Sequence, residues 1–313
     1  MQIFGKAPHF NFIGKRKLAM IASIVMVVLS LGSLLTQGLN FGIDFAGGTL
    51  IQVRFDKAMD LAPVRKAIAP IELGDTVVQS FGAPEEVLIR VEKQGKSNEA
   101  QQAIVNDVMA ALKPLAGDNG VEMRRVEFVG PQVGEELTEK GMLAMLYAMI
   151  AILIYISIRF ELRFALGAVA ALVHDVILTM GFFSILQKEF TLVVVAALLT
   201  VVGYSLNDTI VVYDRIREEM KRMKRQPLTN IINEAVNRTL ARTLVTSLTT
   251  ILVLLALFFL GGAVIHDFAL TLLFGVVIGT YSSIFVASPL VLWLDPAKRK
   301  KIADEAEASK EGA

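Results

Sequence analysis

Long apolar stretches alternate with shorter polar segments along this chain, and the pattern predicts a multi-pass membrane protein. Each of six stretches is about 18 residues or longer, which is the length an α-helix needs to cross roughly 30 Å of hydrocarbon. The predicted spans are residues 18–36, 141–158, 164–186, 190–213, 243–263 and 267–294. Outside them lie an N-terminal tail (1–17), a polar segment (37–140) and a C-terminal tail (295–313). We therefore expect an α-helical integral membrane protein with six transmembrane helices.

The polar segment between the first two spans has the periodicities of a small domain. Residues 51–55 alternate between apolar and polar side chains, as in a strand with one buried face. Asp60 precedes a short predicted helix, and Ile104, Val108 and Leu112 recur at helical spacing in a second one, from about residue 97 to 112. Further strands are predicted at residues 76–80, 86–91 and 121–129. The order βαββαβ predicts a ferredoxin-like domain with both helices on one face of the sheet.

Composition and charge support this organisation and orient it. The chain is 54% hydrophobic and only 19% charged, outside the usual range of soluble domains. Of its 31 Lys and Arg residues, 19 fall in the tails and in the segments on the same side of the membrane. By the positive-inside rule, we expect both termini to be cytoplasmic and residues 37–140 to lie on the opposite side of the membrane. The first span has no small-residue cleavage site after it, so we expect an uncleaved signal anchor.

The same inventory limits the chemistry that we expect. There is no cysteine, which excludes a disulfide framework and a thiolate metal site. The net charge of +1 offers no reason to expect a nucleic-acid partner. The sequence predicts no metal, no organic cofactor and no enzymatic activity.

Asp208 is an acid inside the predicted span 190–213. Six residues separate it from Asp214 at the polar end of that span, which places its carboxyl roughly 9 Å inside the hydrocarbon. A charged Asp in lipid costs about 3 kcal/mol even on lenient insertion scales, so such a residue predicts ion or proton movement. The polar residues of this span share one helical side with Val211; the stripe is Thr200, Tyr204, Asn207, Asp208 and Val211.

The next span carries a second polar stripe, spaced as one face of a helix. Its members are Thr239, Arg242, Thr243, Thr246, Thr249 and Thr250. Since neither stripe is stable against lipid, the two are expected to face each other or a shared hydrated path. Arg242 enters at the cytoplasmic end, where its side chain either approaches Asp208 or anchors at the lipid headgroups.

His174 and Asp175 lie near the middle of the third span. Adjacent side chains on a helix diverge by about 100°, so only one of them is expected to face a given path. A helix-packing hydrogen bond is the expected role of His174, and a secondary proton relay through Asp175, His174 and Thr246 is the alternative. In the last span, Gly275 and Gly279 form a small-xxx-small pattern that predicts close helix packing.

Three segments together resemble a known family. They are FGIDFAGGTLIQVRF (41–55), GYSLNDTIVVYDRIRE (203–218) and RTLARTLVTSLTT (238–250). They are similar to the signatures of the SecD/SecF family of bacterial protein-export membrane proteins, and the order of one span, one periplasmic domain and five spans also matches. The resemblance implies an accessory subunit of the Sec translocase in the bacterial inner membrane, with residues 37–140 in the periplasm. With SecD, such a subunit uses the proton-motive force to drive late preprotein translocation. It implies protons as the coupling ion and, as partners, SecD, the SecYEG translocon, YajC and YidC, and unfolded preprotein.

The resemblance also assigns roles to residues. The proton-coupling residues that it implies are Asp208, Arg242 and Asn207. More distantly, the fourth span is similar to the Asp-Asp segment of resistance-nodulation-division exporters, with Asn207 where those exporters have the first acid. Asp208 is then the only titrating member of the pair. The first signature is interpreted as structural, allowing a tight chain path from membrane to sheet and a capped turn; its residues are Phe41, Gly42, Asp44, Gly47 and Gly48.

Two other functions remain open at this point. One is half of a proton-coupled exporter of small molecules or lipids, although a domain of about 100 residues is small for a porter cleft. The other is an intramembrane aspartyl protease with Asp175 and Asp208 as its dyad. The Gly-x-Gly-Asp pattern of that class is absent, because Asp208 follows Ser-Leu-Asn.

Overall fold

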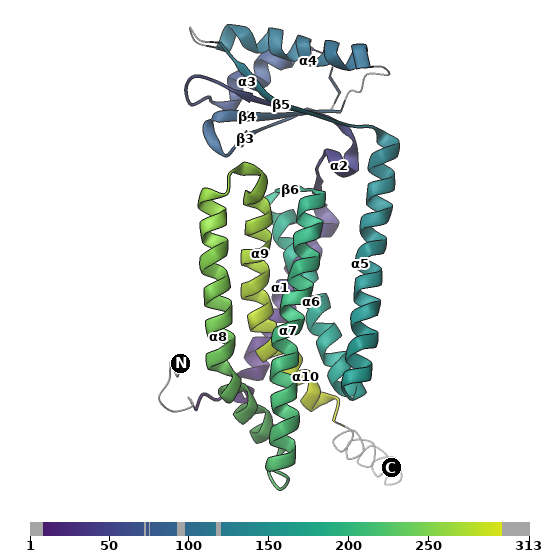
Figure 1. The fold of residues 1–313 in the computed structure, drawn as a ribbon, viewed down its shortest axis with the longest axis vertical. Coiled ribbons are helices and arrows are strands. Elements are labelled where there is room, and N and C mark those ends of the chain that lie inside the picture. The colour runs from purple at the N-terminus through teal and green to yellow at the C-terminus, as the bar shows by residue number, and fades with distance from the viewer. Residues whose placement is uncertain (1–8, 72, 75, 93–97, 117–119, 296–313) are drawn as a thin grey trace, which may run out of the picture.

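The fold is a bundle of six long helices with an α+β domain at one end (Figure 1). The computed structural model describes residues 9–71, 73–74, 76–92, 98–116 and 120–295. The first eight residues of the predicted N-terminal tail, and all but the first of the predicted C-terminal tail, lie outside the described residues.

All six predicted spans are helices that are long and apolar enough to cross a membrane. The helices are α1 (Arg16–Thr36), α5 (Pro131–Arg159), α6 (Leu162–Leu186), α7 (Leu192–Arg222), α8 (Leu228–Leu260) and α9 (Ala263–Ser282). The last span continues from α9 through a π-helical turn, Ser283–Ala287, into α10 (Ser288–Trp293). Helices α6, α7 and α9 are the most buried, whereas α1, α5 and α8 lie at the periphery. The prediction of an α-helical membrane protein with six transmembrane helices is confirmed.

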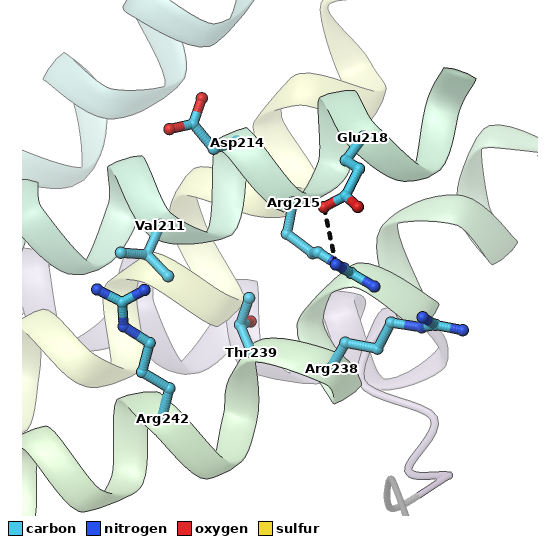
Figure 2. A pocket seen from close by; sticks show the side chains of 7 residues that line it. All are labelled: Val211, Asp214, Arg215, Glu218, Arg238, Thr239 and Arg242. Carbon is cyan, nitrogen blue, oxygen red and sulfur yellow. Dashed lines mark hydrogen bonds and ion pairs between the residues drawn. The ribbon is translucent and has the colours of Figure 1, made fainter. Parts of the chain in front are cut away.

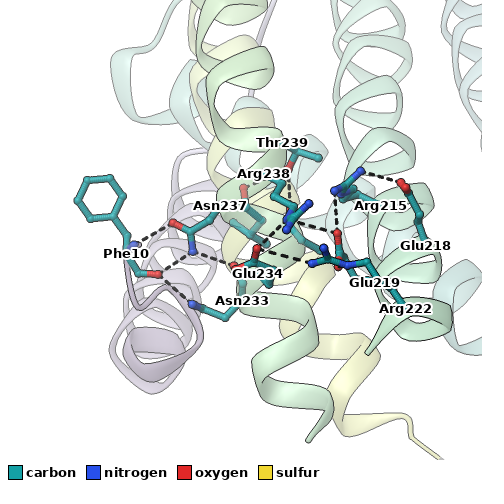
Figure 3. Close-up of polar contacts among 12 residues, drawn as sticks. Phe10, Arg215, Glu218, Glu219, Arg222, Asn233, Glu234, Asn237, Arg238 and Thr239 are labelled. Atoms are coloured by element: carbon teal, nitrogen blue, oxygen red, sulfur yellow. Dashed lines mark hydrogen bonds and ion pairs between the residues drawn. The ribbon is translucent and has the colours of Figure 1, made fainter. Parts of the chain in front are cut away.

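One segment differs from its prediction. The predicted spans 190–213 and 243–263 leave residues 214–242 as a polar inner loop, but α7 continues to Arg222, α8 begins at Leu228, and only residues 223–227 connect them. The polar residues here stabilise a helical hairpin through ion pairs. The fully buried Glu219 forms ion pairs with Arg215 and Arg222, each at 2.7 Å, and Arg238 approaches it from α8 at 3.4 Å (Figure 3). The charged residues that the sequence pattern assigns to a loop therefore form ion pairs within α7 and between α7 and α8.

The chain near residue 10 packs against this hairpin. The side chain of Asn237 accepts the Phe10 backbone N–H at 2.8 Å and donates to the Phe10 carbonyl at 2.8 Å (Figure 3). Asn233 accepts from the Phe12 backbone N–H at 2.9 Å. The segment before α1 is thus held by α8, at the end of the bundle away from the α+β domain.

The α+β domain is ferredoxin-like, as predicted. Its elements are β2 (Gly48–Arg54), α3 (Leu61–Ile68), β3 (Thr76–Phe81), β4 (Ala83–Val91), α4 (Asn98–Leu112) and β5 (Glu122–Val129). The strands form one antiparallel sheet in the order β3-β4-β2-β5. Helices α3 and α4 cover one face, where Val53, Val64 and Val108 belong to one buried core. The other face, with Leu50 and Leu88, packs against Ile43.

A second, much smaller sheet joins the domain to the bundle. Strand β1 (Asn40–Phe41) pairs in parallel with β6 (Glu189–Phe190), which lies between α6 and α7. Arg90 of β4 donates hydrogen bonds to the Phe41 carbonyl and to the side chain of Asn40, and lies 3.9 Å from the Glu189 carboxylate. Burial raises the pKa of Glu189, and the Arg90 charge opposes that shift. The domain is therefore attached to the bundle by backbone pairing and by the partly buried guanidinium of Arg90.

Close helix packing in the last span follows from its glycines. A Cβ at Gly279 would lie 2.9 Å from the Cβ of Ser205, and one at Gly275 would overlap the side chain of Val201. Both neighbours are in α7, so α9 and α7 approach each other along this face.

We predict that Gly275→Ala destabilises the protein by about 1–3 kcal/mol, the usual range for overpacking. The matched control is Gly203→Ala in α7, where a Cβ would meet no atom of the described chain within 4 Å. Thermal unfolding of the detergent-purified chain should show a lower melting temperature for Gly275→Ala and an unchanged or higher one for Gly203→Ala. Equal melting temperatures for the two variants would contradict this packing.

Candidate functional site

Asp208 lies in the interior of the bundle, where α7 meets α8 and the last span. Its side chain is 7% exposed. Thr243 Oγ1 of α8 donates to Oδ1 at 3.0 Å, and Ser283 Oγ, at the start of the π-helical turn, donates to Oδ2 at 3.3 Å. No ion pair to Asp208 occurs among the described residues. Its carboxyl can therefore change charge without breaking a salt bridge.

A second carboxyl, that of Asp175 in α6, is fully buried close by in the same core. Its Oδ2 accepts hydrogen bonds from Ser205 of α7 at 2.6 Å and from Ser282 of α9 at 2.7 Å. Its Oδ1 lies 2.9 Å from His174 Nδ1, so the two adjacent side chains contact each other although they leave the helix in different directions. Asp175 thus joins three central helices.

The two carboxyls are linked through consecutive residues of the last span. Ser282 donates to Asp175, and Ser283 donates to Asp208. The π-helical turn begins at Ser283, and π-turns within α-helices are often found at functional sites. A change in hydrogen bonding at one carboxyl therefore acts directly on the backbone that positions a donor for the other.

The His174 ring borders a cavity of about 280 Å³ between α1 and the last span. The ring stacks on Tyr281, and its Nε2 has no hydrogen-bond partner among the described residues. Apart from His174 and Ser23, the residues lining this cavity are apolar. His174 thus connects the Asp175 cluster to a cavity at the edge of the bundle.

The two polar stripes divide between the interior and the surface. Asp208 and Thr243 face inward and are hydrogen-bonded to each other, as expected for facing stripes. Asn207, Thr246 and Thr249 are exposed instead. Thr246 donates only to the Arg242 carbonyl of its own helix and contacts neither Asp175 nor His174, so the structure does not bring together the three residues of the expected secondary relay. Likewise, the Asn207 side chain is exposed whereas that of its neighbour Asp208 is buried.

Arg242 lines a cavity of about 640 Å³ between α7 and α8 (Figure 2). The cavity is also bordered by polar and charged side chains of both helices, namely Asp214, Arg215, Glu218, Arg238 and Thr239, and by Val211. Arg242 is exposed, and no hydrogen bond or ion pair joins it to Asp208, both residues being described. Its charge acts on Asp208 through space only. The cavity extends to Val211, one helical turn from Asp208.

The family-signature residues lie where the chain leaves α1 and enters the domain. Gly47 and Gly48 have φ angles of 72° and 118°, and a Cβ at Gly48 would lie 2.6 Å from the Val91 carbonyl oxygen. Gly42 donates its backbone N–H to the Phe190 carbonyl at 2.9 Å, and the ring of Phe41 contacts that of Phe190 edge to face. Asp44 does more than cap a local turn, because its Oδ2 accepts the backbone N–H of Leu192, the first residue of α7, at 2.9 Å.

Sequence reasoning missed the hydroxyl donors of both carboxyls on the last span and on α7. Ser205, Ser282 and Ser283 stand in apolar runs where a serine carries no distinctive pattern. The nearest available sequence signal was the small-xxx-small pattern of Gly275 and Gly279, because Gly279 packs against Ser205. Within the described residues, no group of three or more His, Asp or Glu side chains is placed to hold a metal ion.

Comparisons with known proteins agree with this architecture. A family model for "Protein export membrane protein SecD/SecF, C-terminal" matches residues 108–297, and one for the "SecD/SecF GG Motif" matches residues 32–59. The chain is 83% identical to the protein translocase subunit SecF of Magnetococcus marinus over 97% of this chain and 98% of that protein. It is 49% identical to the subunit of the same name in Vibrio alginolyticus, over 100% and 98% of the two chains.

Solved structures of SecDF are also similar. The crystal structure of SecDF from Thermus thermophilus, described as a translocon-associated membrane protein, superimposes with a TM-score of 0.80 at 36% identity. The similarity covers 91% of this chain but only 38% of the SecDF chain, so this protein spans well under half the length of that relative. A super-membrane-facing form of SecDF gives a TM-score of 0.69, also at 36% identity, with 96% of this chain and 40% of SecDF covered.

We predict that Ser282→Ala destabilises the bundle by about 1–3 kcal/mol, because it leaves a buried carboxylate short of one of its donors. Thr249→Ala is the matched control, since the Thr249 hydroxyl is exposed and bonds only to its own helix. Thermal unfolding in detergent should separate the two variants. Equal melting temperatures would show that the Asp175 cluster does not hold these helices together.

Proposed function

Because the chain belongs to the SecD/SecF family of protein-export membrane proteins, we propose that it is an accessory subunit of the Sec translocase. In this function, it works with SecD and uses the proton-motive force to drive late preprotein translocation. The coupling ion is the proton, and the protein itself catalyses no covalent reaction.

The observation that carries the coupling role is the environment of Asp208. Its carboxyl is buried among helices and held by two neutral hydroxyls rather than by a cation. In an apolar setting, a proton that binds or leaves such a group changes the local free energy strongly, because burying a charge without a partner is costly. Protonation of Asp208 can therefore alter how α7, α8 and the last span pack.

A route for the proton is supported by the surroundings of the site. The 640 Å³ cavity at Arg242 gives water access from one end of the bundle to within a turn of Asp208. One helical turn beyond the cavity-lining Val211 and Arg242, the exposed polar side chains of Asn207 and Thr246 need a polar partner within the membrane. SecD is the partner that we assign to that face. In this proposal, Asp208 is the residue that binds and releases the proton, and Asn207 and Arg242 are polar residues beside it.

Asp175 and His174 form a secondary relay in this proposal. His174 and Asp175 are hydrogen-bonded to each other. Ser282 donates to Asp175, and the next residue, Ser283, donates to Asp208. This route does not include Thr246, whose hydroxyl bonds to its own helix. The same geometry argues against an aspartyl dyad, because the carboxyls of Asp175 and Asp208 are held by separate sets of hydroxyls and are not hydrogen-bonded to each other in the described structure.

The orientation that we propose places the α+β domain in the periplasm and both termini in the cytoplasm, with the bundle in the inner membrane. The start of α1 and the end of α10 lie at the end of the bundle away from the domain (Figure 1). The ion-paired arginines around Glu219 are at that same end. The SecYEG translocon, YajC, YidC and unfolded preprotein are further proposed partners, with preprotein meeting the periplasmic domain.

We predict that Asp208→Asn leaves folding and assembly with SecD intact but abolishes the stimulation of export by a proton gradient. The amide oxygen can still accept one of the two hydroxyls, of Thr243 or Ser283, and the amide NH2 can donate to the oxygen of the other, yet the side chain cannot bind a proton in the working pH range. Glu161→Gln, a variant of an exposed acid between α5 and α6 that lies outside the cavity lining, is the matched control and should keep the stimulation. Translocation into inverted membrane vesicles with and without a gradient measures both; full stimulation in Asp208→Asn would refute the switch.

We predict that Arg242→Ala moves the pH dependence of gradient-driven export toward higher pH, because the removed cation no longer favours the ionised form of the nearby carboxyl. Arg242→Lys should retain most of the wild-type profile. Lys221→Ala removes an exposed cation from the cytoplasmic end of α7 and serves as the control. An Arg242→Ala profile that coincides with the control would identify Arg242 as a headgroup anchor without a coupling role.

A further inference from the structure

Asp44 joins two parts of the protein that lie far apart in the sequence. It belongs to α2 (Ile43–Ala46), the single helical turn between α1 and the first strand of the domain. Its carboxylate accepts the backbone N–H of Leu192, a residue 148 positions away that opens α7. A carboxylate at a helix N-terminus satisfies an otherwise unpaired N–H and interacts favourably with the helix dipole. Asp44 therefore attaches α2 to the helix that carries Asp208.

The same turn is wedged against two other elements. In α5, a Cβ at Gly134 would lie 2.7 Å from the Phe45 carbonyl oxygen, so the α2 backbone touches the beginning of α5. Behind α2, Gly47 and Gly48 lead directly into β2, the strand that holds the centre of the domain sheet. A displacement of α2 must therefore move the first strand of the domain.

Backbone contacts make this attachment stiff. The Gly42 N–H donates to the Phe190 carbonyl at 2.9 Å, next to the β1–β6 pair. The ring of Phe45 stacks on that of Phe190. The Asp44 bond extends this attachment from the β6 strand to α7 itself, which is continuous from Leu192 through Asp208.

We infer that Asp44 is a positioning residue for energy coupling: through its bond to Leu192, it transmits displacements of α7 that follow charge changes at Asp208 to α2 and the periplasmic domain. This inference rests on the proposed function, because it takes Asp208 as the origin of the movement. About 24 Å of helix separate Leu192 from Asp208, and a packed helix carries a shift of one part along its length. A residue that served only stability would leave the domain movement unchanged.

The test measures the distance between the domain and the bundle in the full chain, reconstituted with SecD in liposomes. The chain has no native cysteine, so spin labels attached at Lys66→Cys in α3 and Leu260→Cys at the end of α8, before the chain is combined with SecD, report one distance. With Asp44 present, Asp208→Asn should shift the distance distribution, because it mimics the protonated carboxyl. In an Asp44→Ala background, the same substitution should produce less than half of that shift.

Two matched variants keep the test independent of folding defects. Leu192→Pro removes the donor of the Asp44 bond at the first helical position, where proline is well tolerated, and the extended Thr191 before it suits a proline. It should reduce the shift as Asp44→Ala does, and the double variant should reduce it no further. Asp60→Ala removes a similar cap within the domain, at α3, and should leave the shift intact.

The possible outcomes separate the inference from the proposed function. A full shift in both Asp44→Ala and Leu192→Pro would overturn the inference while leaving Asp208 as the switch. An absent shift with Asp44 intact, together with normal gradient-driven export in Asp208→Asn, would overturn both. An equal reduction in Asp60→Ala would show that any loss of a helix cap weakens the movement, and would also overturn the inference.

Discussion

The structure depends on the need to hold carboxyl groups inside an apolar bundle. A buried carboxylate without partners is unstable by several kcal/mol, so each acid dictates which side chains surround it. Asp175 recruits hydroxyls from α7 and α9, and Asp208 recruits them from α8 and the last span. Satisfying these two groups brings four helices to a common centre. The glycines of α9 make this arrangement possible, because they allow the helix to approach α7 closely.

Within the proposed function, this constraint also explains how a proton can become a movement. Apart from His174 beside Asp175, the donors to both carboxyls are neutral hydroxyls, which can reorient when the charge changes, and two of them are consecutive residues at a π-helical turn. The turn is a local departure from the regular hydrogen-bonding pattern of the α-helix. Its backbone can therefore shift with a smaller loss of helical hydrogen bonds than a continuous α-helix would suffer. The central helices are thus bonded firmly enough to move together, through contacts that depend on protonation.

Much of the fold was predictable because it follows from periodicity. Six apolar runs of spanning length and the βαββαβ order of the polar segment predicted the bundle and the ferredoxin-like domain, and both are confirmed. The helical hairpin at 214–242 was not predictable in this way, since its polar residues are satisfied by ion pairs to Glu219 across two helices. Within the site, the depth of Asp208 marked it in advance, whereas its donor Ser283 lies in an apolar run and gave no signal. The contact between Asp44 and Leu192 spans 148 residues, and only the folded chain reveals it.

The most direct test of the account is whether Asp208 changes its protonation state while the protein works. Infrared difference spectroscopy of the chain reconstituted with SecD, recorded as the pH is lowered, detects the C=O stretch of a buried protonated carboxyl. We expect a band that appears on acidification in the wild type, persists in Glu161→Gln and is missing in Asp208→Asn. A band that remains in full in Asp208→Asn would contradict the central claim that this carboxyl is the proton switch.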